Sequence, residues 1–307
     1  MNKQHVITSS FAGPVYPEKP EDALRFFQTA WEQGPEPAEV SLPTPPVLIV
    51  PHIDFRVNLS CYVAAYKHLA RWQTFPETFV ILGVGHQCPY EIASLPLTYK
   101  TIFGEVETNL PAWDILQNNY SEPLALAEEA FENEHSLDFA IIWLQALQQI
   151  IKKPGKFDIV PILMGGLSDS ILNKTIPGPE SDFIQFCAAF KKMLAHLDPA
   201  KTCIIASIDG CHVGPRFDHP FQAAERVQMA VSAWEAELWS KCRSDQFDDF
   251  FHHLCSVANY FYFDGVGALS LLLQTFKMEA HREAYALWHE ERDQSFVTFC
   301  GGFMRRL

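Results

Sequence analysis

The sequence predicts an α/β protein with one central, mostly parallel sheet that is flanked by helices on both faces. Short runs of consecutive apolar, largely β-branched residues recur along the chain, and stretches with helical periodicity separate them. Strands buried on both faces have such continuous apolar runs, and helical crossovers between them build a parallel sheet. With 307 residues, of which 48% are hydrophobic, the chain can bury the core of a single large domain.

Each apolar run is expected to form one strand of this sheet. The expected strands lie at 47–50 (VLIV), 78–85 (TFVILGVG), 157–165 (FDIVPILMG) and 201–208 (KTCIIASI). Helices are expected at 59–72, within 124–151, at 181–196, 220–240 and 246–257, and after Gly265. The segment SFVTFCGGFM at 295–304 predicts a last strand at or near an edge of the sheet.

The first 46 residues differ from the rest of the chain in composition. They are rich in proline and acidic residues and end in EQGPEPAEVSLPTPP. This composition favours irregular structure over a core element. We therefore expect an irregular N-terminal arm at 1–46, to which we assign no chemistry, followed by an α/β domain at 47–307.

The charge balance excludes several classes of partner. With 23 basic and 37 acidic side chains, the formal charge of -14 repels phosphate backbones and anionic membranes. The N-terminus, MNKQHVITSS, lacks the pattern of a signal peptide, and no run approaches the roughly 20 apolar residues that cross a bilayer. The eight cysteines form no CxxC pair, which argues against a disulfide framework or a zinc knuckle. We expect a cytoplasmic protein without nucleic-acid or membrane partners.

Polar residues follow three of the expected strands. His52 comes after VLIV, and His86 comes after TFVILGVG. Asp209 and His212 come after KTCIIASI. Ligands of open α/β sheets bind outside the carboxyl ends of the strands, so we expect these side chains along one rim. His135, in the segment ENEHS before an expected helix, can lie above that rim.

A lone carboxylate, Asp264, stands inside an aromatic stretch at the start of the helix after Gly265. Asp264 and Asp209 can each be explained as helix caps. Alternatively, two imidazoles and one carboxylate on one face of a cation leave three positions open, as in non-haem Fe(II) enzymes that hold substrate and O₂ together. On this interpretation the metal ligands are His52, His86 and Asp264.

The other titratable residues on the rim then have expected roles in catalysis. His135 or His212 is expected to move protons as the acid or base, and Asp209 to fix a histidine tautomer. Fe(II) is the expected ion. Zinc and manganese accept the same donors, so a hydrolytic zinc site with an activated water stays open as an alternative.

Several segments together resemble the recurring motifs of the Memo family. In chain order they are PHIDF, LGVGHQ, ENEHSLDF, VPILMGGLSD and SIDGCHVGPRF. The resemblance covers roughly residues 45 to 303, and SFVTFCGGFM is similar to the closing strand of the family. It implies the fold of the class III extradiol ring-cleaving dioxygenases, which use Fe(II) held by two histidines and a carboxylate.

The resemblance also suggests roles for individual residues. His52 and His86 stand where the family has its first two metal-ligating histidines. His135 matches the histidine of its E-H-S segment. Asp209 and His212 match its S-D-x-C-H-type segment.

Two departures from the Memo pattern are visible. Memo proteins commonly have a cysteine where this chain has Asp264, and a hard carboxylate in place of a soft thiolate favours Fe(II) or Mn(II). The family usually has His-Ala-Gly where this chain has His52-Ile53-Asp54, so a bulkier residue and a carboxylate there could narrow the pocket or bind a cationic substrate group. Alternatively, Asp54 and Arg56 could form a surface ion pair of little energetic value.

The expected function is that of an iron-dependent, oxygenase-like enzyme, which would use O₂ on a small organic substrate such as a phenol or an amino-acid derivative. Two alternatives stay open. Memo proteins are also described as binding partners, which implies a non-catalytic adaptor that binds metal or peptide. The zinc-dependent hydrolase is the third possibility.

Overall fold

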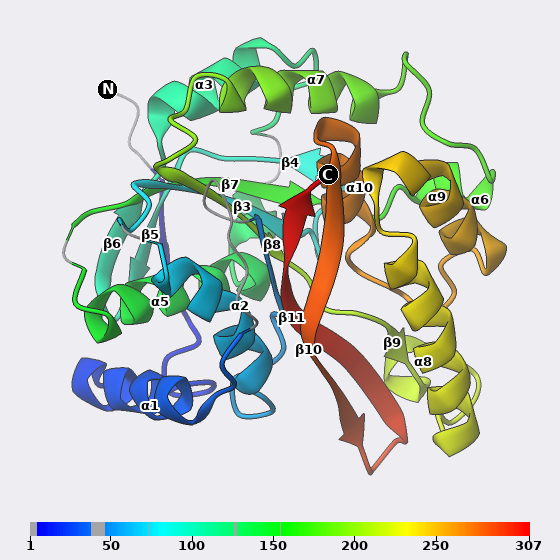
Figure 1. Cartoon of the computed structure of the whole chain (residues 1–307), viewed down its shortest axis with the longest axis horizontal. Helices are drawn as coiled ribbons and strands as arrows, with labels where there is room; N and C mark the ends of the chain where they lie inside the picture. The colour runs from blue at the N-terminus through cyan, green and yellow to red at the C-terminus, as the bar shows by residue number, and fades with distance from the viewer. Residues whose placement is uncertain (1–4, 38–46, 73, 126–127, 154) are drawn as a thin grey trace.

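The computed structural model describes residues 5–37, 47–72, 74–125, 128–153 and 155–307 (Figure 1). In this part of the chain, eight strands form one large mixed sheet, which confirms the predicted α/β fold. Its strands, in spatial order, are β10 (Met278–Glu290), β11 (Ser295–Arg306), β2 (Val47–Val50), β8 (Thr202–Ser207), β3 (Thr78–Val84), β7 (Asp158–Met164) and β4 (Ile92–Ala93), and β9 (His212–Val213) pairs with β11.

The centre of the large sheet is parallel. Strands β2, β8, β3 and β7 all pair in parallel, so their carboxyl ends lie along one edge. Strands β4, β10 and β11 are antiparallel additions at the two sides. The expected last strand, β11, lies beside the edge strand β10, so its predicted place near an edge is confirmed.

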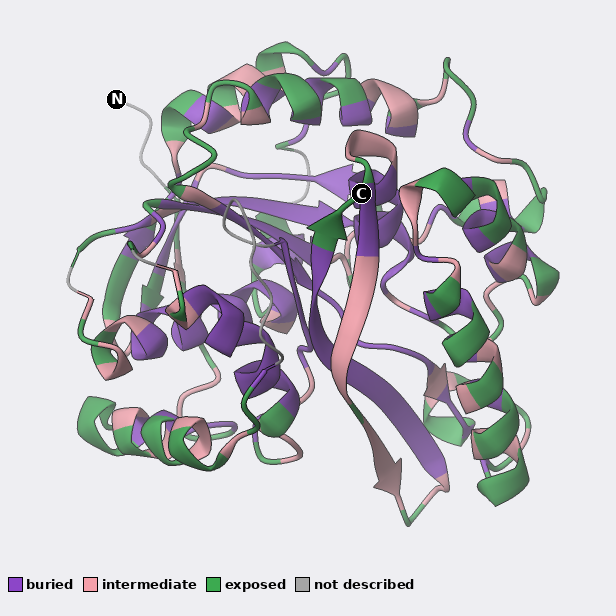
Figure 2. Ribbon diagram, viewed as in Figure 1, coloured by how far each residue is buried: buried purple, intermediate pink, exposed green. Residues whose placement is uncertain are grey.

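The side chains of the central strands alternate between two apolar cores, one on each face of the sheet. Val47 and Ile49 of β2 pack into one core, whereas Leu48 and Val50 pack into the other. This alternation follows from the two-residue period of a strand, and burial on both faces explains the continuous apolar runs. Figure 2 shows that these strands are buried along most of their length.

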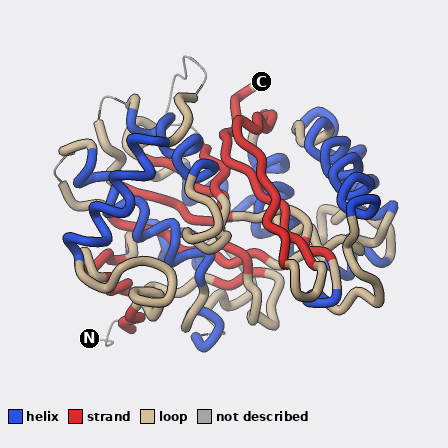
Figure 3. Tube along the Cα trace, turned by 90° about the horizontal axis from the view of Figure 1, so that it is seen from below, coloured by secondary structure: helices blue, strands red, loops and turns tan. Residues whose placement is uncertain are grey.

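Helices cover both faces of the sheet, as predicted (Figures 1 and 3). One core includes residues of α1 (Pro20–Gln33), α2 (Ser60–Ala70), α4 (Glu128–Phe131) and α5 (His135–Ile150). The other includes residues of α3 (Leu110–Asn118), α6 (Ser168–Leu172), α7 (Asp182–Leu194), α8 (Glu225–Ser240), α9 (Phe247–Ser256) and α10 (Val266–Thr275). Two short 3-10 helices, η1 (Pro215–Phe217) and η2 (Ser244–Gln246), join these elements.

The N-terminal segment is more regular than its composition suggests. Strand β1 (His5–Thr8) pairs in parallel with β5 (Leu97–Thr101), and β6 (Gly104–Glu107) completes a small three-stranded sheet. Helix α1 begins with a proline followed by two acidic residues, which suit a helix start, and it buries Ala23 and Phe27. The prediction of an irregular arm is therefore wrong for these two elements. Residues 38–46 of that arm lie outside the described residues.

Two expectations drawn from composition concern membranes and cysteines. Within the described residues, none of the helices has the length and apolar character needed to cross a membrane. All eight cysteines are free thiols, and all except the half-buried Cys88 are buried. Burial among apolar side chains fits their expected role as small hydrophobic residues.

Candidate metal centre

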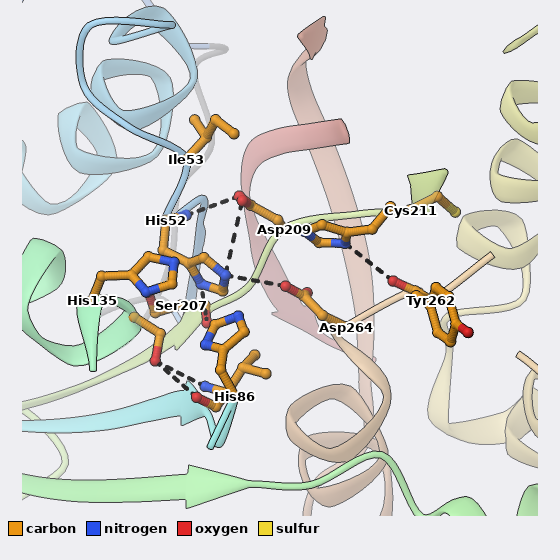
Figure 4. A network of polar contacts seen from close by, with 12 residues as sticks. His52, Ile53, His86, His135, Ser207, Asp209, Cys211, Tyr262 and Asp264 are labelled. Carbon is orange, nitrogen blue, oxygen red and sulfur yellow. Dashed lines mark hydrogen bonds and ion pairs between the residues drawn. The ribbon is translucent and has the colours of Figure 1, made fainter. Parts of the chain in front are cut away.

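The carboxyl ends of three neighbouring strands bring the predicted polar residues together. Strands β2, β8 and β3 are adjacent and parallel, and they are followed by His52, Asp209 and His86 respectively. The rim predicted from the strand ends is therefore present. Figure 4 shows these three side chains converging with those of His135 and Asp264.

His52 lies at the centre of this group, and its side chain is only 1% exposed. Its Nδ1 lies 3.1 Å from the carbonyl oxygen of Ser207, which can only accept, so Nδ1 carries a hydrogen. Its backbone N–H donates to Asp209 Oδ1 at 2.9 Å. Its other ring nitrogen, Nε2, lies 3.1 Å from Asp264 Oδ2 and 3.8 Å from Asp209 Oδ2.

His86 is oriented by Glu134, a buried residue that directly precedes α5. His86 Nδ1 donates to the two carboxylate oxygens at 3.0 and 3.2 Å, and the backbone N–H of His86 donates at 3.2 Å. The same carboxylate accepts the N–H of Ser136 at 3.0 Å, which caps the helix. Burial opposes ionisation, but the contacts with His86 outweigh it and lower the pKa of Glu134 to about 2. His86 Nε2 is thus left free to bind a cation.

His135, the first residue of α5, completes a group of three imidazoles. Its ring stacks on His86 with centroids 4.6 Å apart and lies 5.0 Å from the ring of His52. One nitrogen from each of the three histidines lies within 4.8 Å of the other two, so this cluster can hold a metal ion. Burial, together with the charges of His52 and His86, lowers the pKa of His135 to about 3. Sequence reasoning gave this residue a role in proton transfer.

Asp264 comes to the cluster from the loop before α10. Its side chain is 10% exposed, and helix α10 has Gly265 as its cap residue, so Asp264 does not cap the helix. Asp264 Oδ2 contacts His52 Nε2 at 3.1 Å, and among the described residues neither the Asp264 oxygens nor that nitrogen has a further hydrogen-bond partner. Two ligands of one ion stand roughly 3 Å apart, which fits the 3.1 Å between these two residues.

The charges at this site are mutually dependent. Burial lowers the pKa of His52, but the carboxylates of Asp209 and Asp264 outweigh this effect and raise it to about 9. Burial also raises the pKa of Asp209. For Asp264, His52 outweighs the effect of burial and lowers the pKa. This arrangement fits a divalent cation. Such an ion would bind the buried ring nitrogen and carboxylate oxygens, and it would balance the negative charge of the two aspartates.

His212 is held by the loop that carries Asp264. Its Nδ1 donates to the carbonyl oxygen of Tyr262 at 3.1 Å, so Nε2 is the nitrogen without hydrogen in the neutral ring. Its nitrogens are not part of the three-histidine group. Asp54, the expected contact for a cationic substrate, is instead paired with Arg56 Nε at 3.0 and 3.1 Å, so its charge is already balanced.

Sequence reasoning missed three groups that orient the histidines. Glu134 was visible in the ENEHS segment next to His135, and a buried acid beside a ligand histidine is the pattern that could have identified it. The carbonyl oxygens of Ser207 and Tyr262 carry no such pattern, because any residue type supplies a backbone carbonyl.

Comparisons with known proteins find relatives of this chain. A model of the Memo-like protein family matches residues 8–298. A MEMO1 family protein of Aquifex aeolicus is 25% identical over 95% of this chain and 71% of its own length. A MEMO1 family protein of Thermus thermophilus is 27% identical over 67% of this chain, and human MEMO1 is 26% identical over 57%. The chain spans only 55% and 53% of the length of these last two relatives.

Proposed function

This chain belongs to the Memo-like protein family, and on that basis we propose that two histidines of the cluster, together with Asp264, bind Fe(II) and support an oxygen-dependent reaction of a small organic substrate. The proposed ligands are His52, His86 and Asp264. Bound Fe(II) with three open positions would hold the substrate beside O₂. Phenols and amino-acid derivatives are the proposed substrate class.

The buried contact between His52 and Asp264 carries this proposal. His52 Nε2 and the two Asp264 oxygens have no hydrogen-bond partner beyond one another among the described residues, and one cation would satisfy all three atoms. His52 and His86 each have a hydrogen-bond acceptor at Nδ1, which leaves Nε2 as the metal-binding nitrogen. A hard carboxylate as the third ligand favours Fe(II) or Mn(II) over Cu(I).

The remaining polar residues are assigned to proton transfer. His135, whose ring lies against those of both proposed histidine ligands, is proposed to move protons to or from the substrate. His212 has its hydrogen on Nδ1 in the neutral ring, so its Nε2 is the nitrogen proposed to accept a proton. Asp209, which accepts the backbone N–H of His52, is proposed to hold His52 in place.

A zinc-dependent hydrolase is the second candidate, and the three-histidine cluster favours it. His52, His86 and His135 supply the three nitrogens that some catalytic zinc sites use, with water as the fourth ligand. The two candidates differ in the third ligand, which is Asp264 for iron and His135 for zinc. Substitution of each residue separately distinguishes them.

The experiment is anaerobic reconstitution of metal-free protein with Fe(II) or Zn(II), followed by measurement of bound metal and of O₂ uptake with a panel of catechols and phenolic amino-acid derivatives. We expect one Fe(II) per chain and about 10- to 100-fold weaker Fe(II) binding in Asp264→Ala. His135→Ala is expected to keep its iron and lose turnover. Asp248→Ala, at an exposed position of α9, is the control.

Each contrary outcome has a distinct meaning. Unchanged iron content in Asp264→Ala would remove that residue from the ligand set. Tight zinc binding that depends on His135 and comes with hydrolytic activity would favour the second candidate. Metal binding without O₂ uptake or hydrolysis across the panel would contradict both enzymes and favour a metal- or peptide-binding adaptor.

A further inference from the structure

Two loops meet on the aspartate side of the cluster. The histidine loop, residues 209–219, follows β8, and the aspartate loop, residues 258–264, precedes α10. We propose that His219 and Asn259 are positioning residues, which hold the aspartate loop so that it presents Asp264 and the Tyr262 carbonyl to the site. The functional part of this inference rests on the proposed metal site.

Three consecutive carbonyls of the aspartate loop are bound by the histidine loop. The carbonyl oxygen of Tyr260 accepts from His219 Nε2 at 2.8 Å. That of Phe261 accepts the backbone N–H of His212 at 2.9 Å, and that of Tyr262 accepts from His212 Nδ1 at 3.1 Å. Two histidines of one loop thus hold three successive residues of the other.

His219 has a fixed tautomer and a fixed ring position. The backbone N–H of Gly214 donates to its Nδ1 at 3.3 Å, so Nδ1 has no hydrogen and Nε2 is the donor to Tyr260. The residue is 4% exposed, and its ring lies 4.8 to 5.2 Å from the rings of Tyr260, Phe221 and Tyr262. Both nitrogens are therefore used within the fold and neither is available to a substrate.

Asn259 holds the aspartate loop from within. Its side-chain amide donates to the carbonyl oxygen of Phe263 at 3.1 Å, and its Oδ1 accepts the N–H of Phe263 at 3.0 Å. Ala258, Asn259 and Tyr262 have φ values of 49°, 49° and 45°, in the left-handed region that non-glycine residues rarely adopt. Such a backbone persists only where its surroundings hold it, and the paired hydrogen bonds of Asn259 do so.

The consequence for the site follows from the sequence positions. Asp264 directly follows Phe263, and its N–H donates to the carbonyl oxygen of Gly210 at 3.2 Å. Fixing Phe263 therefore fixes the carboxylate that faces His52. Fixing Tyr262 keeps the hydrogen of His212 on Nδ1. If the contacts served stability alone, their loss would lower stability without changing the tautomer or the metal affinity.

The test combines two measurements on the full-length protein. The first is ¹⁵N NMR of histidine-labelled, metal-free protein, which reports the tautomer of His212. The second is Co(II) titration with absorption spectra, which report affinity and coordination. The variants are His219→Leu, His219→Gln, which keeps an N–H donor, and Asn259→Gly, which removes the side-chain contacts but accepts the left-handed φ. His68→Leu is the control, because this buried histidine of α2 bonds to Glu283 instead.

We expect mixed His212 tautomers and about 10- to 100-fold weaker Co(II) binding in His219→Leu and Asn259→Gly, with an altered spectrum. His219→Gln should stay close to wild type, and His68→Leu should lose stability only. Unchanged tautomer and affinity in folded Asn259→Gly would overturn the proposal, as would equal changes in His68→Leu. If His219→Leu does not fold, the other two variants decide. If the wild type binds no metal, the proposed function is wrong. The tautomer of His212 then tests by itself whether His219 and Asn259 position the loop.

Discussion

At the residue scale, the properties of the site depend on acceptors that lie outside the cluster. Glu134 accepts from His86 Nδ1 and from the backbone N–H groups of His86 and Ser136. A carboxylate can accept all of these bonds at once, because each oxygen has two lone pairs. An amide has only one such oxygen. The charge and geometry of Glu134 are therefore both needed to orient His86.

We predict that Glu134→Gln weakens metal binding by about 10- to 100-fold while the protein stays folded. The new amide nitrogen must face one of the N–H donors, so His86 loses its orientation. Competition titration against a chelator measures the affinity. Glu132→Gln, two residues away at an exposed position, is the control and should bind like wild type. Equal affinities of the two variants would contradict this role.

A second residue-scale prediction concerns Asp138, which is 3% exposed inside α5. Burial raises its pKa from 3.8 to about 7, although the hydrogen bond from Ser9 Oγ, at 3.0 Å, acts in the opposite direction. Between these pH values the folded state binds more protons than the unfolded chain, so stability falls as the pH rises from about 4 to about 7. Over this pH range, the ionisation of Asp138 lowers the free energy of unfolding by about 4 kcal/mol.

Asp138→Asn removes this ionisation and keeps an oxygen that can accept from Ser9. The variant should therefore gain free energy of unfolding relative to wild type as the pH rises, with most of the gain complete near pH 8. Urea unfolding at pH 5 and pH 8 measures the difference. Asp248→Asn, on the exposed surface, should show no such gain. Parallel pH curves for Asp138→Asn and wild type would show that this carboxyl is not buried as described.

Part of the site could be predicted from sequence because strand ends are visible there. His52, His86 and Asp209 each follow a continuous apolar run, and the parallel centre of the sheet brings such positions to one edge. Asp264 follows no strand, and only its carboxylate, which could complete a site with two histidines, identified it as a candidate ligand. The grouping of His135 with His52 and His86 depends on how α5 is placed against β3, which local sequence does not specify.

At the element scale, the buried strands were predictable and the half-exposed one was not. The central strands are apolar on both faces, whereas β10 has the sequence MEAHREAYALWHE and is mostly half-buried. Its alanines, glutamates and leucine favour a helix, but long antiparallel pairing with β11 holds it extended. Helix α1 was missed for the opposite reason. Its proline-rich surroundings concealed one apolar face.

Strand β11 approaches α2 so closely that one position between them requires glycine. A Cβ on Gly301 would lie 1.8 Å from the carbonyl oxygen of Cys61, which belongs to the helix backbone. We predict that Gly301→Ala lowers the free energy of unfolding by about 3 kcal/mol, because strand and helix must move apart. Urea unfolding measures this loss. The control, Gly178→Ala, introduces a methyl group with no neighbour within 4 Å and should change stability by about 0.5 kcal/mol or less.

At the scale of the whole molecule, the N-terminal helix belongs to the same core as the sheet that carries the site. Phe27 of α1 is 0% exposed, and its ring lies 5.3 Å from that of Phe55 and 4.9 Å from that of Trp143 in α5. Phe55 follows His52 by three residues, and α5 begins with His135. The helix therefore supports the segments that bear two of the three clustered histidines.

We predict from this that the first helix and the sheet unfold together and that Phe27→Ala costs about 3 to 5 kcal/mol. Urea unfolding followed by the fluorescence of the seven tryptophans, which include Trp31 of α1 and Trp143 of α5, and by far-UV circular dichroism should give coincident curves. Phe26→Ala is the matched control, because the side chain of Phe26, next to Phe27 in the sequence, is only half-buried. Separate transitions, or equal costs for the two variants, would show that the segment before residue 47 is an independent arm. Coincident curves, with a large cost at Phe27 alone, would make α1 an integral part of the domain that holds the candidate metal site.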